Sequence, residues 1–282
     1  MTATSFDRIG PIPPDSPVVV SVPHAGRDYP LQLRAAAAVP VASMLALEDR
    51  HADTLARAAR GDETLFVQRR ARAWIDLNRA EDERDPLIDD GARPIPAGVA
   101  ATKLRSGLGL IPRRAAPGVT LWRRRLADEE VCQRIADDHR PYHAALNTAL
   151  AAARDRFGIA LLIDLHSMPP LPGPRPARIV LGDRFGRSAG ARLVHRIESE
   201  AIKAGAMVAL NTPYPGGHIL GRHGNPTDGI HAIQVEVDRR LYLDAGLNAP
   251  GKGLAATAAL LRRMIDAATD ELLCGEYAQA AE

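Results

Sequence analysis

Short apolar runs alternate with segments of helical periodicity along this chain, and this alternation limits the folds that it can adopt. Val18–Val22, for example, is rich in β-branched residues and lies between two prolines, which predicts a buried strand. Strands that alternate with helices predict an α/β fold, in which helices are layered on a mostly parallel sheet. The predicted strands are 18–22, 65–67, 73–77, 159–165, 178–181, 207–210 and 231–237, and the predicted helices are 41–60, 128–157 with a break near Pro141, 188–203 and 254–273.

The composition is that of a folded protein with a sizeable core. The chain has 282 residues, of which 46% are hydrophobic and 25% charged. It shows no internal repeat and no convincing linker, so we expect a single domain over residues 1–282. No run of about 18 apolar residues occurs, which argues against a membrane protein. The low aromatic content of 4% and the formal net charge of +2 argue against nucleic-acid binding.

Cysteine usage and the first residues of the chain indicate a cellular location. The two cysteines, Cys132 and Cys274, have no CxxC spacing, so neither a disulfide framework nor a thiolate metal site is expected. Residues 1–10 lack the apolar core of a signal peptide. We therefore expect a cytoplasmic protein.

Residues 91–127 depart from the regular pattern. The stretch has no clean period and carries eight basic residues but no Asp or Glu. A long structureless stretch within a domain is usually functional or disordered. Two interpretations stay open: a lid-like basic excursion that attracts an anionic ligand, or a solvated loop.

Polar side chains follow or interrupt four of the predicted strands. His24 comes just after 18–22, Asn78 and Arg79 follow 73–77, His166 follows 159–165, and Glu236 lies within 231–237. Ligands of open α/β sheets bind beyond the carboxyl ends of the strands. This pattern favours a metal-assisted hydrolase.

His24 and His166 are candidate metal ligands. Strand alternation puts Asp164 on the same face as His166, and a carboxylate beside a ligating histidine is a usual arrangement around metals. A structural Asp–His pair, and a capping or surface role for His24, are the alternatives.

A catalytic zinc ion takes three protein ligands, so two histidines need a third donor. Glu48, Asp49 and Asp53 lie early in the predicted helix 41–60 and are available. The HExxH signature is absent, so the chain is not expected to be a zincin.

The remaining candidates would act on the substrate. Glu236 could serve as a general base beside a metal, or could lie on the wet face of an edge strand. Arg79 with Asn78 could bind a substrate carboxylate, or Arg79 could pair with the acidic run 81–83. Gly216 and Gly217 precede His218 in a glycine-rich region where the backbone could approach a small ligand.

Taken together, these segments resemble the N-formylglutamate amidohydrolase (deformylase) family. The matching segments occur in the family's order over residues 15–245. They are Ser21-Val22-Pro23-His24-Ala25-Gly26, Ile75-Asp76-Leu77-Asn78-Arg79, Pro141-Tyr142-His143, Ile163-Asp164-Leu165-His166-Ser167-Met168, Leu181-Gly182-Asp183, Gly216-Gly217, and Gln234-Val235-Glu236 followed by Leu241-Tyr242.

The resemblance implies a three-layer α/β/α fold, zinc-carboxypeptidase-like, with a mostly parallel mixed sheet. It also implies zinc-dependent hydrolysis of a small anionic N-acyl amino acid, late in histidine degradation. By the resemblance, His24, Asp49 and His166 are zinc ligands, with Glu48 as the rival to Asp49. Glu236 is the catalytic residue, and Asn78 and Arg79 bind the substrate carboxylate.

Three hypotheses follow. The first is a deformylase that releases glutamate and formate from N-formyl-L-glutamate, in which Arg79 and the basic stretch hold the two carboxylates. The second is a zinc hydrolase of another N-acyl amino acid or peptide-like amide. The third is a non-enzymatic anion-binding protein that uses residues 91–127.

Overall fold

The computed structural model describes residues 4–94, 100–116 and 118–274, and these divide into two units. Unit 1 takes its described residues from 1–7, 23–48 and 68–144, and unit 2 takes its own from 8–22, 49–67 and 145–282. The expectation of a single domain stays a prediction.

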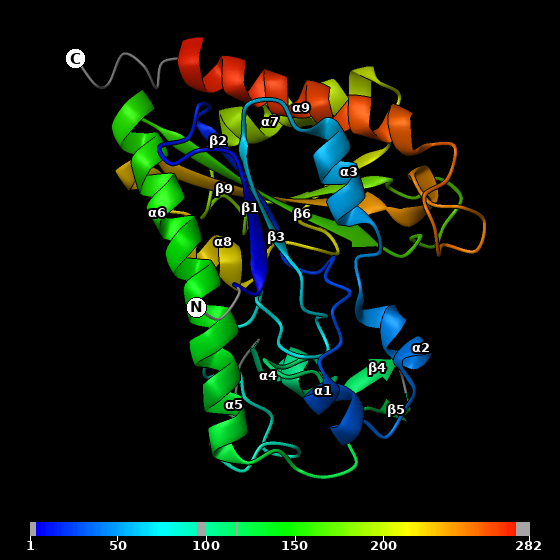
Figure 1. Ribbon diagram of the computed structural model, residues 1–282. Helices are drawn as coiled ribbons and strands as arrows, with labels where there is room; N and C mark the ends of the chain where they lie inside the picture. Colours follow the sequence, from blue (N-terminus) through cyan, green and yellow to red (C-terminus); the bar gives the residue numbers. More distant parts are fainter. Residues whose placement is uncertain (1–3, 95–99, 117, 275–282) are drawn as a thin grey trace. The chain divides into compact units, whose positions relative to one another are not determined.

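Unit 2 contains the main sheet. Its strands are β1 (Phe6–Ile9), β2 (Val18–Val22), β3 (Thr64–Gln68), β6 (Ala160–Met168), β7 (Ile179–Gly182), β8 (Val208–Leu210) and β9 (Ile230–Asp238). The first residues of β1 belong to unit 1. The seven strands lie in the order β1-β3-β2-β6-β9-β7-β8 (Figure 1). β2 pairs in parallel with β3 and β6, as do β6 with β9 and β7 with β8, whereas β7 runs antiparallel to β9. The predicted mixed, mostly parallel sheet is therefore confirmed.

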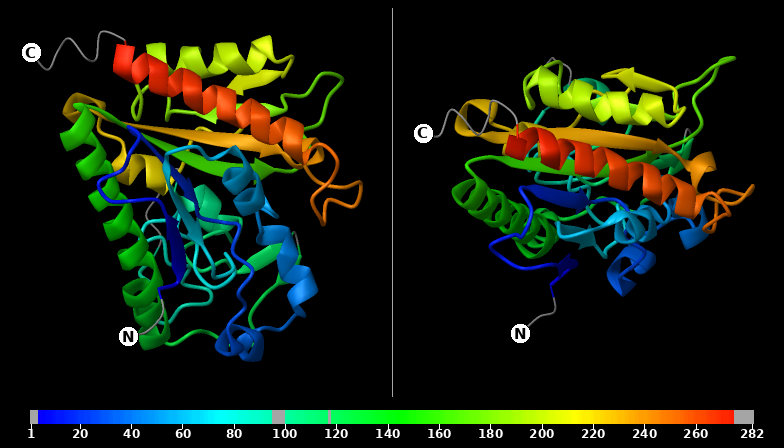
Figure 2. Two further views of the ribbon diagram at one scale, coloured as in Figure 1. Left: turned by 45° about the horizontal axis from the view of Figure 1, so that its top comes forward. Right: turned by 90° about the horizontal axis from the view of Figure 1, so that it is seen from above.

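Helices cover both faces of this sheet. α3 (Ala52–Ala59), α7 (Ala191–Lys203) and α9 (Leu254–Cys274) lie on one face, with α7 and α9 side by side (Figures 1 and 2). α6 (Arg140–Phe157) and α8 (His218–His223) lie on the other face. Each helix on the first of these faces buries an apolar stripe, such as Leu193, Val194 and Ile197 of α7. The α/β/α layering expected for the fold is thus present in unit 2.

Unit 1 is built from short elements around its own apolar core. They are α1 (Leu31–Ala36), α2 (Val41–Met44), the 3₁₀ turn Leu45–Leu47, α4 (Ala100–Arg105), the antiparallel strands β4 (Arg114–Ala116) and β5 (Val119–Thr120), α5 (Asp128–Arg134) and a π-helical segment, Ile135–His139. Its fully buried residues include Leu33, Ile75, Leu77, Leu110 and Leu121.

Two secondary-structure predictions are wrong. The helix expected over 41–60 is broken, because Glu48 is extended and His51 is left-handed with a φ of 57°. The helical spacing of apolar residues continues through this break, so periodicity alone could not predict that the helix is interrupted. The strand expected over 73–77 is a series of turns, in which the Trp74 amide donates to Ala71 O at 2.8 Å. Its alternating apolar residues are buried in unit 1 without pairing in a sheet.

Within the basic stretch 91–127, the described residues form α4, β4 and β5 and bury Leu104, Leu110 and Trp122. Several of its cations have structural partners: Arg113 bonds to Asp85 at 2.8 Å, and Arg124 bonds to Glu130 at 2.7 Å. Residues 95–99 and 117 lie outside the described residues. The lid role stays a prediction. Among the described helices, none is both long and apolar enough to cross a membrane.

Candidate functional site

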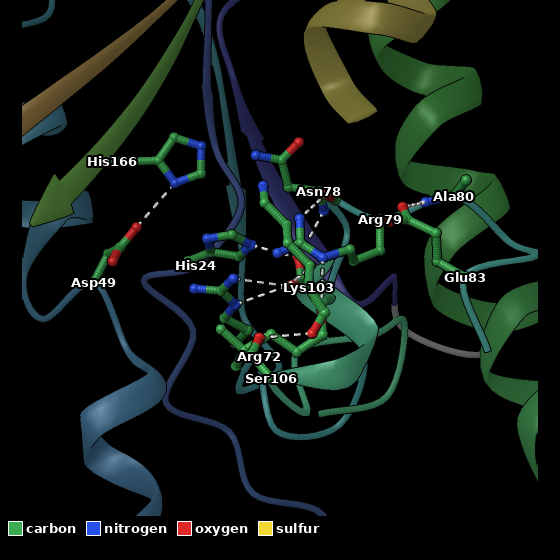
Figure 3. Close-up of polar contacts among 12 residues, drawn as sticks. His24, Asp49, Arg72, Asn78, Arg79, Ala80, Glu83, Lys103, Ser106 and His166 are labelled. Atoms are coloured by element: carbon green, nitrogen blue, oxygen red, sulfur yellow. Dashed lines mark hydrogen bonds and ion pairs between the residues drawn. The ribbon is translucent and has the colours of Figure 1, made fainter. Parts of the chain in front are cut away.

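His166 lies near the carboxyl end of β6, between two carboxylates of unit 2. Its Nε2 is 2.8 Å from Asp164 Oδ2. Its Nδ1 is 3.0 Å from Asp49 Oδ2, a contact that Figure 3 shows. Ser21 of β2 donates to the other oxygen of Asp164 at 2.9 Å. Burial opposes a charge on the imidazole, but the Asp164 carboxylate outweighs it and raises the pKa of His166 well above its ordinary value. The predicted pair of Asp164 and His166 on one face is present.

Glu236 occupies the matching position on the neighbouring strand. It is opposite His166 in the register of β6 and β9, it is buried, and Gln234 donates to its Oε1 at 3.0 Å. β9 lies between β6 and β7, so the alternative of an edge strand with a wet face is wrong. A carboxylate inside a sheet covered on both faces costs free energy, which favours a functional role for Glu236.

Asp49 and Glu48, the two candidates for the third metal ligand, have different partners in the structure. Asp49 faces His166, whereas Glu48 belongs to unit 1 and accepts a hydrogen bond from the Tyr29 hydroxyl. The break at residues 48–51 positions these neighbours. Asp53, the third acid considered, lies in the first turn of α3.

Arg239 is a contributor that the sequence reasoning missed. Its Nη2 is 3.3 Å from Asp49 Oδ1, and its Nε donates to Ser167 Oγ at 3.1 Å. It follows the carboxyl end of β9, so the rule that drew attention to His24 and His166 could have found it. Its guanidinium orients the second oxygen of Asp49.

In unit 1, His24 is held by a buried carboxylate. Its Nε2 is 2.7 Å from Asp76 Oδ1, and that oxygen also accepts the Asn78 amide at 2.8 Å. Burial opposes ionisation of Asp76, but the positive charge of Arg72, with His24 and Arg79, holds the pKa of Asp76 well below its ordinary value. The sequence analysis did not assign Asp76 a role. Its signal was the Ile-Asp-Leu tripeptide at 75–77, which recurs at 163–165 just before His166.

The two imidazoles therefore share one arrangement. Each has Nε2 held by a fully buried aspartate, Asp76 or Asp164, so that Nδ1 is the nitrogen available to a metal. A carboxylate that fixes the ring and tautomer of a histidine is the usual support of a metal ligand. Nδ1 of His166 and Oδ2 of Asp49 converge on each other, as two ligands of one ion would. This nitrogen and oxygen donor set fits zinc.

Asn78 and Arg79 follow directly in unit 1. Arg79 Nη1 donates to Asn78 O at 2.6 Å, and its Nε donates to Leu108 O at 2.8 Å. The alternative of an ion pair between Arg79 and the acidic run is wrong: Glu81 pairs with Arg140 at 2.8 Å, and Glu83 accepts the Ala80 amide at 2.7 Å. Arg79 is thus held by backbone carbonyls, and its Nε also lies 4.0 Å from Asp76 Oδ2.

Two buried histidines support this segment from the helical stretch 135–157. His143 Nε2 is 3.0 Å from Leu77 O, and His139 Nε2 is 2.8 Å from Arg79 O. Their spacing of four residues places both on one helix face, with ring centroids 4.3 Å apart. They fix the backbone on both sides of Asn78, a positioning role that was not predicted.

Gly216 and Gly217 lie in the loop between β8 and α8, in unit 2. Gly216 has a φ of +106°, and a Cβ there would meet Leu220 Cδ2 at 2.4 Å. The loop also packs on β7, where a Cβ on Gly182 would meet Tyr214 O at 2.6 Å. Burial raises the pKa of Tyr214, and the negative charge of Glu236 adds to the effect. The loop thus brings Tyr214 near Glu236. The substrate-binding role of the two glycines stays a prediction.

Comparison with known proteins gives consistent results. The sequence profile of N-formylglutamate amidohydrolase matches residues 16–243. An N-formylglutamate deformylase of Pseudomonas putida is 31% identical over 81% of this chain and 82% of its own length. One of Pseudomonas aeruginosa is 32% identical over the same shares.

Solved structures agree with the sequence matches. The crystal structure of an N-formylglutamate amidohydrolase from Ralstonia eutropha superposes with a TM-score of 0.84 and 33% identity, over 99% of this chain and 100% of the other. A gene product of Agrobacterium tumefaciens, 20% identical, has a TM-score of 0.69 over 96% of this chain and 95% of its own, and shows the same fold. The chain belongs to the N-formylglutamate amidohydrolase family.

Proposed function

We propose that this protein is a zinc-dependent deformylase that hydrolyses N-formyl-L-glutamate to glutamate and formate. The names of the relatives support the reaction, because two of them are N-formylglutamate deformylases. The observation that carries the proposal is the buried carboxylate of Glu236, which lies beside His166 on an interior strand. A cytoplasmic location and a role in histidine degradation stay predictions.

We further propose that His24, Asp49 and His166 are the three protein ligands of zinc. Chain connectivity supports the contribution of His24, which follows the end of β2 by two residues. β2 pairs with β6 so that Ser21 is opposite Asp164, and the next residues of both strands run toward His24 and His166. Two Cα–Cα steps span at most about 7.6 Å, so His24 is tethered near this end of the sheet.

The chemistry of the donors supports zinc at this position. Two imidazoles held by carboxylates and one aspartate would supply the three protein ligands that a catalytic zinc ion takes. When bound, zinc supplies Lewis-acid chemistry, which polarises the formyl carbonyl and makes water easier to deprotonate.

Glu236 is the proposed general base and general acid. Its carboxylate accepts a proton from the attacking water as the new C–O bond forms at the formyl carbon. The same proton then passes to the glutamate nitrogen as the C–N bond breaks, which releases formate and the free amine. Gln234 donates a hydrogen bond to Oε1 of Glu236, which helps to fix the orientation of the carboxylate.

Asn78 and Arg79 are the proposed partners of the substrate α-carboxylate. The backbone carbonyls of Asn78 and Leu108 fix the guanidinium, so little conformational entropy is lost when a carboxylate binds. Gly216 and Gly217 are proposed to let the loop backbone approach the bound substrate.

A direct test is formate release from N-formyl-L-glutamate by the zinc-loaded protein. The Glu236→Gln variant should keep its zinc and lose at least about 100-fold in kcat, because a general base contributes a factor of that order. Glu129→Gln, an exposed carboxylate on α5, is the matched control and should retain full activity.

The substrate class is tested by a panel of N-formyl, N-acetyl and dipeptide derivatives of glutamate. Preference for the N-formyl compound supports a deformylase, and preference for a larger acyl group would defeat that assignment. Near-normal turnover by Glu236→Gln would remove Glu236 from the mechanism.

A further inference from the structure

Lys103 of α4 is a cationic side chain for which the proposed function has no specific role. Figure 3 shows that the side chains of Arg72, Arg79 and Lys103 gather in one region of unit 1. Electrostatic interactions of Lys103 with Arg79, Asp76, Arg72 and Glu83 confirm that these groups lie within range of one another. Three cations therefore share one neighbourhood.

The other members of this cluster already have partners. Arg72 Nη2 is 2.8 Å from Asp76 Oδ2, and its Nε donates to the same oxygen at 2.9 Å. Arg79 is fixed through Nε and Nη1 by backbone carbonyls. Glu83 accepts a hydrogen bond from the Ala80 amide, and Asp76 is fully buried.

Lys103 differs from both arginines. Within the part of the chain that the structure describes, its ammonium forms no hydrogen bond or ion pair. Loss of hydration lowers the pKa of Lys103, and the positive charges of Arg79 and Arg72 lower it further. The negative charges of Asp76 and Glu83 oppose this shift without reversing it. Holding an ammonium beside two guanidiniums costs free energy that a bound anion would recover.

Other cations of the basic stretch 91–127 are less suitable for binding a ligand. Arg113 bonds to Asp85, Arg124 to Glu130, and Arg123 to the carbonyl of Ala37. Their charges serve the structure of unit 1. Lys103 instead lies in the cluster that contains Arg79, the proposed partner of the α-carboxylate.

We propose that Lys103 binds the side-chain carboxylate of the substrate and so selects acidic N-acyl amino acids over neutral ones. This inference rests on the proposed function, because it assigns the second carboxylate of the same substrate. The ligand class is a compact dianion, with two carboxylates on a short aliphatic chain. Arg79 with Asn78 takes one carboxylate, and the flexible stem of Lys103 lets its ammonium reach the other.

The test compares N-formyl-L-glutamate with N-formyl-L-glutamine, which has a neutral amide in place of the side-chain carboxylate. The wild-type zinc enzyme should prefer the glutamate compound. Lys103→Met should lower kcat/KM for N-formyl-L-glutamate by about 10- to 100-fold, mainly through KM, because one charge-assisted contact is lost. Its kcat/KM for N-formyl-L-glutamine should change less than about 3-fold.

Lys252→Met is the matched control, since Lys252 is an exposed lysine of unit 2. It should leave both substrates unaffected. If Lys103→Met lowers both kcat/KM values by the same factor, or leaves the preference for glutamate intact, Lys103 does not recognise the side-chain carboxylate.

A binding measurement separates this inference from the proposed function. If the wild-type protein releases no formate, the proposed function fails, and calorimetry with glutarate and butyrate still tests Lys103. Lys103→Met should then weaken glutarate binding by about 10-fold or more and leave butyrate binding unchanged. Absence of glutarate binding by the wild type, or equal binding by the variant, would overturn the inference.

Discussion

At the scale of single residues, two buried carboxylates hold the imidazoles of the proposed metal ligands. Asp76 and Asp164 are both fully buried, and each holds one histidine through Nε2. A buried carboxylate is costly unless its hydrogen bonds are satisfied, and both aspartates have a second donor, Asn78 N and Ser21 Oγ respectively. The orientation of each proposed ligand is therefore built into the folded chain.

The adjacent residues Glu48 and Asp49 allow a sharp test of the ligand set. Asp49→Asn should lose zinc at least 10-fold more readily than wild type during dialysis against a chelator, because a neutral amide is a poor ligand. Glu48→Gln should retain zinc, since its carboxylate bonds to Tyr29. Metal content is measured by mass spectrometry, and the opposite outcome would make Glu48 the ligand.

The sequence analysis selected candidate residues that follow a strand or interrupt its apolar pattern. His24, His166 and Glu236 stand out for this reason. Asp76 and Arg239 each had a local signal, the Ile-Asp-Leu tripeptide and a position after β9, but the signal did not name their distant partners, His24 and Asp49. No local pattern distinguished Asp49 from Glu48, because the directions of their side chains depend on an interruption of the helix that tertiary packing imposes.

At the scale of elements, regular segments were predicted well and irregular ones poorly. Strong periodicity marks β6, β9, α7 and α9, and these elements pack on one another in the folded chain as their apolar faces predict. The segment 73–77 has strand-like alternation, but its apolar residues fill the core of unit 1 from a chain of turns. The sequence therefore predicted correctly that the apolar residues of 73–77 are buried, but not that their backbone forms turns instead of pairing in a sheet.

One ion pair attaches α9 to the connection between α3 and β3. Arg262 bonds to both oxygens of Glu63 at 2.8 and 2.7 Å, and the Gly61 amide adds a third bond at 2.7 Å. Burial opposes ionisation of Glu63, but the bond with Arg262 outweighs it and lowers the pKa of Glu63 below 4.5. This carboxylate therefore stabilises the fold in its charged form.

Glu63→Gln should lower the free energy of unfolding at pH 7 by about 1.5–3 kcal/mol, because charge-assisted bonds are lost. Glu63 contributes its stability above its unfolded pKa, near 4.5, and the contribution is lost as the pH falls through the lower folded value. The variant should therefore lose less stability than wild type below pH 4.5. Urea unfolding at several pH values measures both effects.

The control for Glu63 is its exposed neighbour. Asp62→Asn removes a charge one residue away and should change stability by less than about 0.5 kcal/mol. Equal losses for the two variants at pH 7 would show that the bonds between Glu63 and Arg262 contribute no specific stability.

At the scale of the whole molecule, the proposed zinc ligands come from both units. His24 belongs to unit 1, whereas Asp49 and His166 belong to unit 2. A metal that binds the folded chain and not the unfolded one stabilises the folded state by mass action. Zinc should therefore act on the stability of the entire protein.

Zinc at about 100 times its Kd should stabilise the folded protein by about 2.7 kcal/mol, which corresponds to a rise in Tm of roughly 5–10 °C. A chelator should reverse the rise, and Asp49→Asn should reduce it to a small fraction. Differential scanning calorimetry of wild type and variant makes the comparison. A Tm that does not respond to zinc would contradict a site formed by the folded chain.

The pairing of β2 with β6 also affects how this protein is made. Ser21 and Asp164 bond to each other across 143 residues of sequence. On the ribosome, β2 cannot pair with β6 until that length of chain has been synthesised, which takes roughly 7–30 s. During this time the nascent polypeptide exposes an apolar strand edge, the kind of surface that aggregates and that chaperones shield.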